Sequence, residues 1–240
     1  MSTPLDDLSL GEARAARDVL IELYVPLDYP WHRTDDVFHK FLAEFLLRRT
    51  TRVVVARVLP ALIQKYPTAE SLARAGDDEL LTLLRPVGLP TRILALSEAA
   101  RLIVRDGMPS SRDGFLTLPQ VGEYVADAML LYGYDMAVLP VDRNAWRVLY
   151  RMLLGRDEVA VPPRSEERAF RHLLTTLVAD LSPRQTRAFH GSILRVAWET
   201  CRRRPICDAC PVSDSCRYGA KMVPHSGPSV PPGSPAGEQL

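Results

Sequence analysis

Long apolar stretches are absent from this chain of 240 residues. None approaches the ~18 residues that a membrane-spanning helix needs, so a helical membrane protein is excluded. The first residues also lack the basic flank and apolar core of a secretory signal, since they read MSTPLDDLSLGEARAARD. We therefore expect a cytoplasmic protein that has no membrane partner.

Lysine is scarce, because only Lys40, Lys65 and Lys221 accompany the arginines among the 30 basic residues. The net charge of +1 is unevenly spread: residues 1–36 hold eight acidic and three basic residues, a net of −5 that leaves +6 for the rest. The positive charge of the residues after position 36 would suit an anionic partner. A solvated charged face is, however, the commoner reason for an excess of basic residues. The shortage of lysine limits which side chains can supply an amine nucleophile.

Alternation of apolar and polar residues with a period of two is also absent, which argues against strands. Apolar residues instead recur at spacings of three and four, so we predict an all-α fold. Thr34, Thr68 and Asp77 are placed to begin helices. The predicted helices cover residues 38–47, 53–66, 77–84, 92–104, 124–132 and 145–154.

Cysteine is rare and confined to one short segment, in the pattern C-x5-C-x2-C-x5-C. Two disulfides would be unusual in a cytoplasmic protein. A zinc site normally pairs two C-x2-C knuckles and this segment has one, so a loop around a 4Fe-4S cluster fits better, with zinc as the alternative. The candidate metal ligands are Cys201, Cys207, Cys210 and Cys216.

A turn rich in proline and glycine precedes the predicted helix near Glu123, in the segment FLTLPQVGEYVADAMLLYG over residues 115–133. Such a turn at a helix N-terminus presents backbone N–H groups that can bind phosphate. Asp142 follows an apolar run and precedes another predicted helix, so by itself it reads first as a helix cap.

These segments together resemble the helix-hairpin-helix DNA glycosylases of the endonuclease III superfamily. Their hairpin pattern L-P-G-V-G-x-x-T-A matches residues 118–126, where Gln120 replaces the first glycine and Val125 the hydroxyl residue, and V-D matches residues 141–142. The cysteine loop is a second match, although the interval between its first two cysteines is one residue shorter than the six residues typical of the family. The third match covers residues 30–34 and 43–51 and is similar to adenine and thymine-DNA mismatch glycosylases.

The resemblance implies roles for residues on both sides of a DNA cleft. Asp142 would stabilise the sugar cation or activate water, and Glu44, in an apolar setting that raises its pKa, would protonate the leaving base. The alternative for Glu44 is a surface ion pair with Lys40. Tyr124 occupies the position of the lysine nucleophile of the lyase members, so we predict no Schiff-base chemistry. It would instead line the base pocket.

The same resemblance assigns DNA contacts. Arg48 or Arg49 would fill the gap left by the everted base, and the loop of Val87, Gly88 and Leu89 would act as a second wedge, although both could be ordinary surface residues. The remaining predicted DNA-binding residues are Leu118, Gln120, Val121, Gly122, Glu123 and Asn144.

The resemblance implies two helical lobes, with residues 1–35 and 141–218 in the cluster lobe, 36–140 as a helical barrel and 219–240 as a disordered tail. We expect a monomeric, monofunctional glycosylase that removes thymine or uracil opposite guanine in double-stranded DNA. It would associate with the nucleoid by binding DNA. The alternatives are removal of adenine opposite 8-oxoguanine, removal of another modified base, or damage binding without catalysis. Only 24 residues follow Cys216, too few for the C-terminal domain of adenine glycosylases.

Overall fold

The computed structural model describes residues 8–26, 29–48, 50–157 and 164–222. All regular structure within these ranges is helical, which confirms the predicted all-α class. No described helix has the length and apolarity needed to cross a membrane. The α-helices are α1 (Leu10–Glu22), α2 (Val37–Leu47), α3 (Arg52–Lys65), α4 (Ala69–Ala73), α5 (Asp77–Leu83), α6 (Pro90–Asp106), α7 (Arg112–Leu116), α8 (Glu123–Ala128), α9 (Arg143–Leu154), α10 (Arg164–Val178), α11 (Pro183–Glu199) and α12 (Gly219–Met222).

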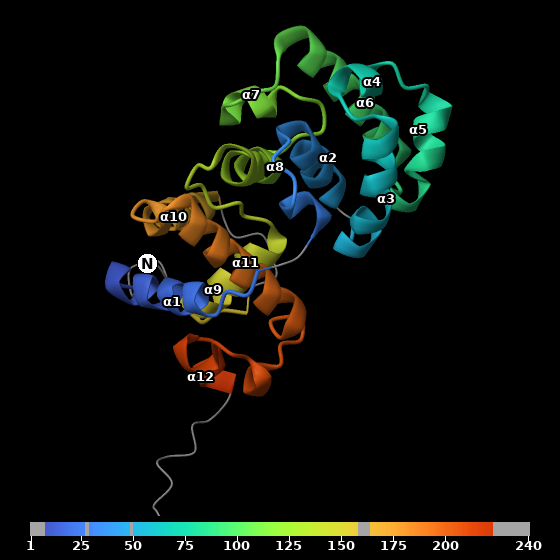
Figure 1. Cartoon of the computed structure of the whole chain (residues 1–240). Helices are drawn as coiled ribbons and strands as arrows, with labels where there is room; N and C mark the ends of the chain where they lie inside the picture. Colours follow the sequence, from blue (N-terminus) through green and yellow to red (C-terminus); the bar gives the residue numbers. More distant parts are fainter. Residues whose placement is uncertain (1–7, 27–28, 49, 158–163, 223–240) are drawn as a thin grey trace, which may run out of the picture.

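The helices gather around two hydrophobic cores. One core runs through α2 to α8 and includes residues from Trp31 to Leu130. The other joins α1 to α9, α10 and α11, so the first helix of the chain packs with the last long ones. In Figure 1, α2 to α8 occupy the upper part of the molecule, and α1 and α9 to α12 the lower part. The chain therefore leaves the lower group after α1 and returns to it at α9.

Local sequence signals explain most helix starts, with two corrections. Thr68 forms the expected reciprocal cap with Ser71 at the start of α4. Thr34 does not cap α2, because Asp36 does so by accepting a hydrogen bond from the His39 amide at 2.9 Å. Asp77 is the first residue of α5 rather than its cap, since the N-cap position belongs to Gly76. Thus α2 begins later than a cap at Thr34 would place it, and α5 begins at Asp77 itself.

Two further segments differ from the predictions. The predicted helix over residues 124–132 is α-helical only to Ala128 and continues as a π-helix from Met129 to Gly133. The expected disordered tail from residue 219 is wrong at its start, because Gly219–Met222 form α12 against the cysteine segment. Residues 223–240 lie outside the described ranges. The π-helix continues α8 directly and contributes Tyr132 to the cleft described next.

Candidate active site

A cleft of about 920 Å³ lies between residues of the two cores. Glu44 and Arg48 reach it from α2, Tyr124 from α8, and Asp142 and Asn144 from the start of α9. Six of the predicted site residues, these five and Gly122, therefore line one cavity although their positions span a hundred residues of sequence. This convergence is what a reaction with two carboxyl groups requires.

Glu44 is buried, with 4% of its surface exposed, among the apolar residues of α2. The alternative of a surface ion pair with Lys40 is therefore wrong. Its Oε2 atom accepts no hydrogen bond within the described residues. Burial raises the pKa of the Glu44 carboxyl from its ordinary 4.5 to about 8, because the charged form loses its hydration. At neutral pH the group is a carboxylic acid that can donate a proton.

The same burial predicts that the stability of the protein depends on pH. Between pH 4.5 and 8 the unfolded chain releases the Glu44 proton while the folded chain keeps it. The free energy of unfolding should therefore lose about 1.4 kcal/mol per pH unit from this group across that window. Urea unfolding of the wild type and of Glu44→Gln at several pH values measures this loss of unfolding free energy. The stability advantage of the variant should grow steadily toward pH 8, and a constant difference would contradict the burial of an ionisable acid.

Asp142 is both a helix cap and a cleft residue. Its Oδ1 accepts a hydrogen bond from the Ala145 amide at 2.7 Å, and its Oδ2 accepts one from Asn144 Nδ2 at 2.8 Å. Asn144 is itself held by Arg147, whose Nη2 lies 3.1 Å from Asn144 Oδ1 and whose Nε donates to the carbonyl of Cys201 at 2.8 Å. A chain of side chains thus fixes the carboxylate and connects it to the cysteine segment.

Tyr124 stands beside both acids. Burial, together with the negative charges of Glu44 and Asp142, raises the pKa of its hydroxyl well above the ordinary value. The phenol is therefore neutral. Its ring lies 6.2 Å from the ring of His190, which comes from α11 and forms a 2.7 Å hydrogen bond through Nδ1 with the hydroxyl of Tyr132. Neutral aromatic rings of this kind can stack on a base.

The hairpin at residues 118–122 leads into α8 as predicted. Leu118 and Val121 bury their side chains in the upper core, so only their backbone can face a ligand. Gln120 takes the left-handed conformation, with φ of 61°, that the usual glycine would adopt without strain. The exposed Glu123 carboxylate lies 3.3 Å from Arg171 and 3.6 Å from Arg112. These arginines offset the negative charge of Glu123 at the N-terminus of α8.

The loop of Val87, Gly88 and Leu89, which we predicted as a second wedge, is not part of the cleft lining. Val87 is buried, whereas Gly88 and Leu89 are exposed and both have positive φ. This loop is tied to the connection between α2 and α3, because Thr50 Oγ1 donates to the Val87 carbonyl at 3.3 Å. Arg49 lies outside the described residues. Arg48 contacts Gln120 through its guanidinium.

Sequence patterns did not indicate several other residues that line the cleft. The Tyr29 and Trp31 rings stack at 4.7 Å, and the Arg52 guanidinium lies 4.0 Å from the centre of the Trp198 ring. Arg52 opens α3 and Trp198 lies near the end of α11, so this contact bridges the two groups of helices. Of the four residues Tyr29, Trp31, Arg52 and Trp198, only Trp31 lies in a segment that resembles the family, and no role was predicted for it.

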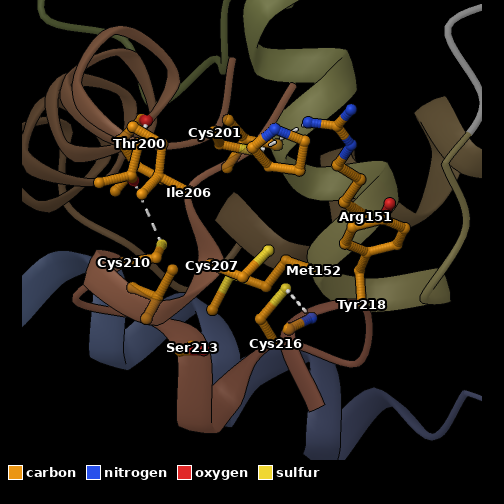
Figure 2. A pocket seen from close by; sticks show the side chains of 15 residues that line it. Arg151, Met152, Thr200, Cys201, Ile206, Cys207, Cys210, Ser213, Cys216 and Tyr218 are labelled. Carbon is orange, nitrogen blue, oxygen red and sulfur yellow. Dashed lines mark hydrogen bonds between the residues drawn. The ribbon is translucent and has the colours of Figure 1, made fainter. Parts of the chain in front are cut away.

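The four cysteines line a second, smaller cavity (Figure 2). All four are free thiols, and each of three sulfurs accepts a hydrogen bond. The donors are Arg151 Nη1 to Cys201 at 3.4 Å, Thr200 Oγ1 to Cys210 at 3.3 Å, and the Gly219 amide to Cys216 at 3.3 Å. Such donors stabilise thiolates, so the chemistry of these residues, though not their present spacing, suits a thiolate-bound metal group. No three His, Cys, Asp or Glu side chains in the described ranges are close enough to hold one metal ion.

Arg151 is the one charged donor among these three, and its side chain is buried, with only 2% of it exposed. Besides Cys201, it donates to the carbonyl of Arg202 at 2.6 Å and pairs with Asp157 at 2.5 Å. A buried guanidinium with this many partners compensates negative charge locally. It also joins the end of α9, whose other end carries Asp142, to the cysteine segment.

Comparisons with known proteins show the family of this chain. Residues 42–174 match the HhH-GPD superfamily of base excision DNA repair proteins. The thymine-DNA glycosylase of Aeropyrum pernix is 34% identical over 88% of this chain and 97% of its own length. The adenine DNA glycosylase of Mycolicibacterium smegmatis is 31% identical over 82% of this chain, which covers 66% of that protein.

A solved structure of a thermostable thymine-DNA glycosylase superposes with a TM-score of 0.76 at 26% identity, over 88% of this chain and 98% of that one. An endonuclease III structure at 21% identity shares the fold, with a TM-score of 0.72 over 90% of this chain and 99% of that one. The predicted superfamily and the predicted enzyme class of DNA glycosylase are thereby confirmed. The chain belongs to the HhH-GPD superfamily of base excision DNA repair proteins.

Proposed function

We propose that this protein is a monofunctional DNA glycosylase that excises thymine or uracil opposite guanine from double-stranded DNA. The observation that carries the proposal is Tyr124, which lines the same cleft as the two acids and occupies the position where the resemblance implies lysine in the lyase members. No lysine is among the described residues that line the cleft. Similarity to thymine-DNA and thymine/uracil-DNA glycosylases supports the choice of base.

In the proposed reaction the target nucleotide is everted into the cleft, because its sugar cannot be attacked within the stack. The N-glycosidic bond breaks, its electron pair moves to the base, and Glu44 gives its proton to the departing base. The Asp142 carboxylate stabilises the positive charge that develops on the sugar and accepts a proton from the water that adds there. Tyr124 stacks on the everted base.

The hairpin supplies the proposed phosphate contact through the backbone amides of Val121, Gly122 and Glu123 at the start of α8. Leu89 is our candidate wedge, because it is exposed on a turn that is anchored through Thr50 to the connection between α2 and α3. Residues 36–140 and 141–218 would form the two lobes that hold the duplex, with α1 in the second lobe, and the enzyme would act as a monomer.

Incubation with a panel of duplexes tests the proposal. The panel carries G:T, G:U, A:8-oxoguanine and alkylated pairs, each sampled with and without alkali. We expect base release from G:T and G:U, with strand breaks only after alkali treatment, and no covalent adduct after borohydride reduction. Breaks without alkali would contradict the monofunctional assignment, and the absence of product from every duplex would favour a protein that binds damage without catalysis.

Adenine removal is the second candidate, favoured by the 31% identity to the mycobacterial adenine glycosylase. Tyr124 argues against it, because the resemblance implies serine at this position in adenine glycosylases. The A:8-oxoguanine duplex in the same panel separates the two candidates. Preferential release of adenine would replace the leading proposal without changing the roles of Glu44 and Asp142.

We also propose that the four cysteines hold a 4Fe-4S cluster. One shared cavity and three hydrogen bonds to sulfur support it, and a buried arginine beside Cys201 offsets the thiolate charge. When bound, the cluster would crosslink the cysteine segment to itself, while hydrogen bonds from Arg151 attach that segment to α9. Elemental analysis of anaerobically purified protein should find about four iron atoms and four sulfides per chain. A single zinc ion without sulfide would favour the alternative site.

A further inference from the structure

Arg48 connects the end of α2 to the hairpin. It is the C-cap residue of α2, one turn after Glu44, and its side chain reaches a residue 72 positions further along the chain. There, Nη1 donates a hydrogen bond to the backbone carbonyl of Gln120 and lies 3.4 Å from its side-chain Oε1. Arg48 is half-buried and Gln120 is exposed, so this contact lies at the rim of the cleft.

Gln120 needs such a partner because of its backbone. With φ of 61° it occupies the left-handed region, where a side chain is unfavourable and glycine is not. The turn itself is closed by the Val121 amide donating to the Leu118 carbonyl at 3.2 Å, which leaves the Gln120 carbonyl to the arginine. The charged donor thus stabilises a conformation that the residue type opposes.

We propose that Arg48 is a positioning residue for the hairpin. Its bond to Gln120 holds the strained turn, and so aims the amides of residues 121–123 at a DNA phosphate from the same helix that carries Glu44. The phosphate as ligand rests on the proposed function. Because its guanidinium is engaged with the hairpin, Arg48 acts on DNA through Gln120 instead of filling the gap left by the base.

A double-mutant cycle tests this coupling. The variants are Arg48→Gln, Gln120→Gly and both together, with Arg48→Met as a second removal of the guanidinium. Binding is measured to a fully matched duplex without any target base, because a phosphate contact does not depend on sequence. Thermal melting of each variant checks that it is folded, which is expected since both side chains lie at the cleft rim.

We expect Arg48→Gln alone to weaken binding about tenfold, in the range for loss of a charge-assisted hydrogen bond. Gln120→Gly removes both the strain and the side-chain acceptor, so in that background Arg48→Gln should weaken binding by less than about twofold. The slope of log Kd against log salt should be the same for Arg48→Gln as for the wild type, because the arginine does not itself neutralise a phosphate.

Equal losses from Arg48→Gln in both backgrounds would overturn the proposal, and so would a salt slope reduced by about 0.9, the value for one lost phosphate contact. Base release from G:T duplexes is measured in parallel and should follow binding across the cycle. Because the matched duplex contains no substrate, coupling on that duplex supports Arg48 as a positioning residue even if no duplex in the panel releases a base, a result that would reject only the proposed function.

Discussion

Replacing Glu44 by glutamine should lower the single-turnover rate of base release by at least about 100-fold, the size of a lost general acid. The amide keeps the shape of the side chain but has no proton to give to the leaving base. Because burial raises the pKa of Glu44 to about 8, the wild-type rate should be steady through neutral pH and fall above pH 8 as the acid ionises. Rapid-quench assays on a G:T duplex from pH 6 to 9.5 measure both effects.

The matched control is Glu98→Gln, the same substitution at an exposed position on α6 in the same group of helices. It should leave the rate unchanged. Glu44→Gln should bind the duplex as well as the wild type does and melt at the same temperature or higher, since it removes a buried acid without a partner on Oε2. A loss of no more than a few-fold in base release would remove Glu44 from the mechanism.

Asparagine at position 142 should reduce base release by about 10²- to 10⁴-fold while the fold is retained. The substitution separates the two roles of this residue. Asparagine caps helices as well as aspartate does, and its side-chain oxygen can still accept the bond from the Ala145 amide. Only the negative charge that would face the sugar cation is lost. Single-turnover kinetics together with thermal melting distinguish the loss of charge from the loss of the cap.

Asp36→Asn provides the control for this change, because Asp36 caps α2 through the same kind of bond, to the His39 amide, on an exposed surface. It should affect neither rate nor melting. Asp142→Ala should lose the rate as well and cost about 1 kcal/mol of stability through the missing cap. If Asp142→Asn released bases at nearly the wild-type rate, the residue would be a cap alone and the proposed stabilisation of the sugar would fail.

Local patterns were sufficient for most of the helices. Apolar residues at helical spacing predicted α2, α3, α5, α6 and α9 to within about two residues, because one face of each helix packs on a core. The pattern failed where tertiary packing changed the local geometry. The segment after Ala128 keeps its apolar spacing yet becomes a π-helix, and α12 forms beside the cysteines in what reads as the beginning of a polar tail. Periodicity does not distinguish an α-turn from a π-turn.

The sequence by itself determined the helical class, the superfamily and the main chemical groups of the cleft. Glu44, Tyr124, Asp142 and the four cysteines lie in short segments whose residue types and order are characteristic. The apolar neighbours of Glu44 also predicted its raised pKa, which agrees with its burial in the structure. Two features depended on the tertiary structure: the placing of His190 and Trp198 beside the cleft, and the bond from Arg48 to Gln120. Each arises between residues far apart in the chain. A hydrogen bond or a shared cleft depends on distance in space, which neighbours in sequence do not specify.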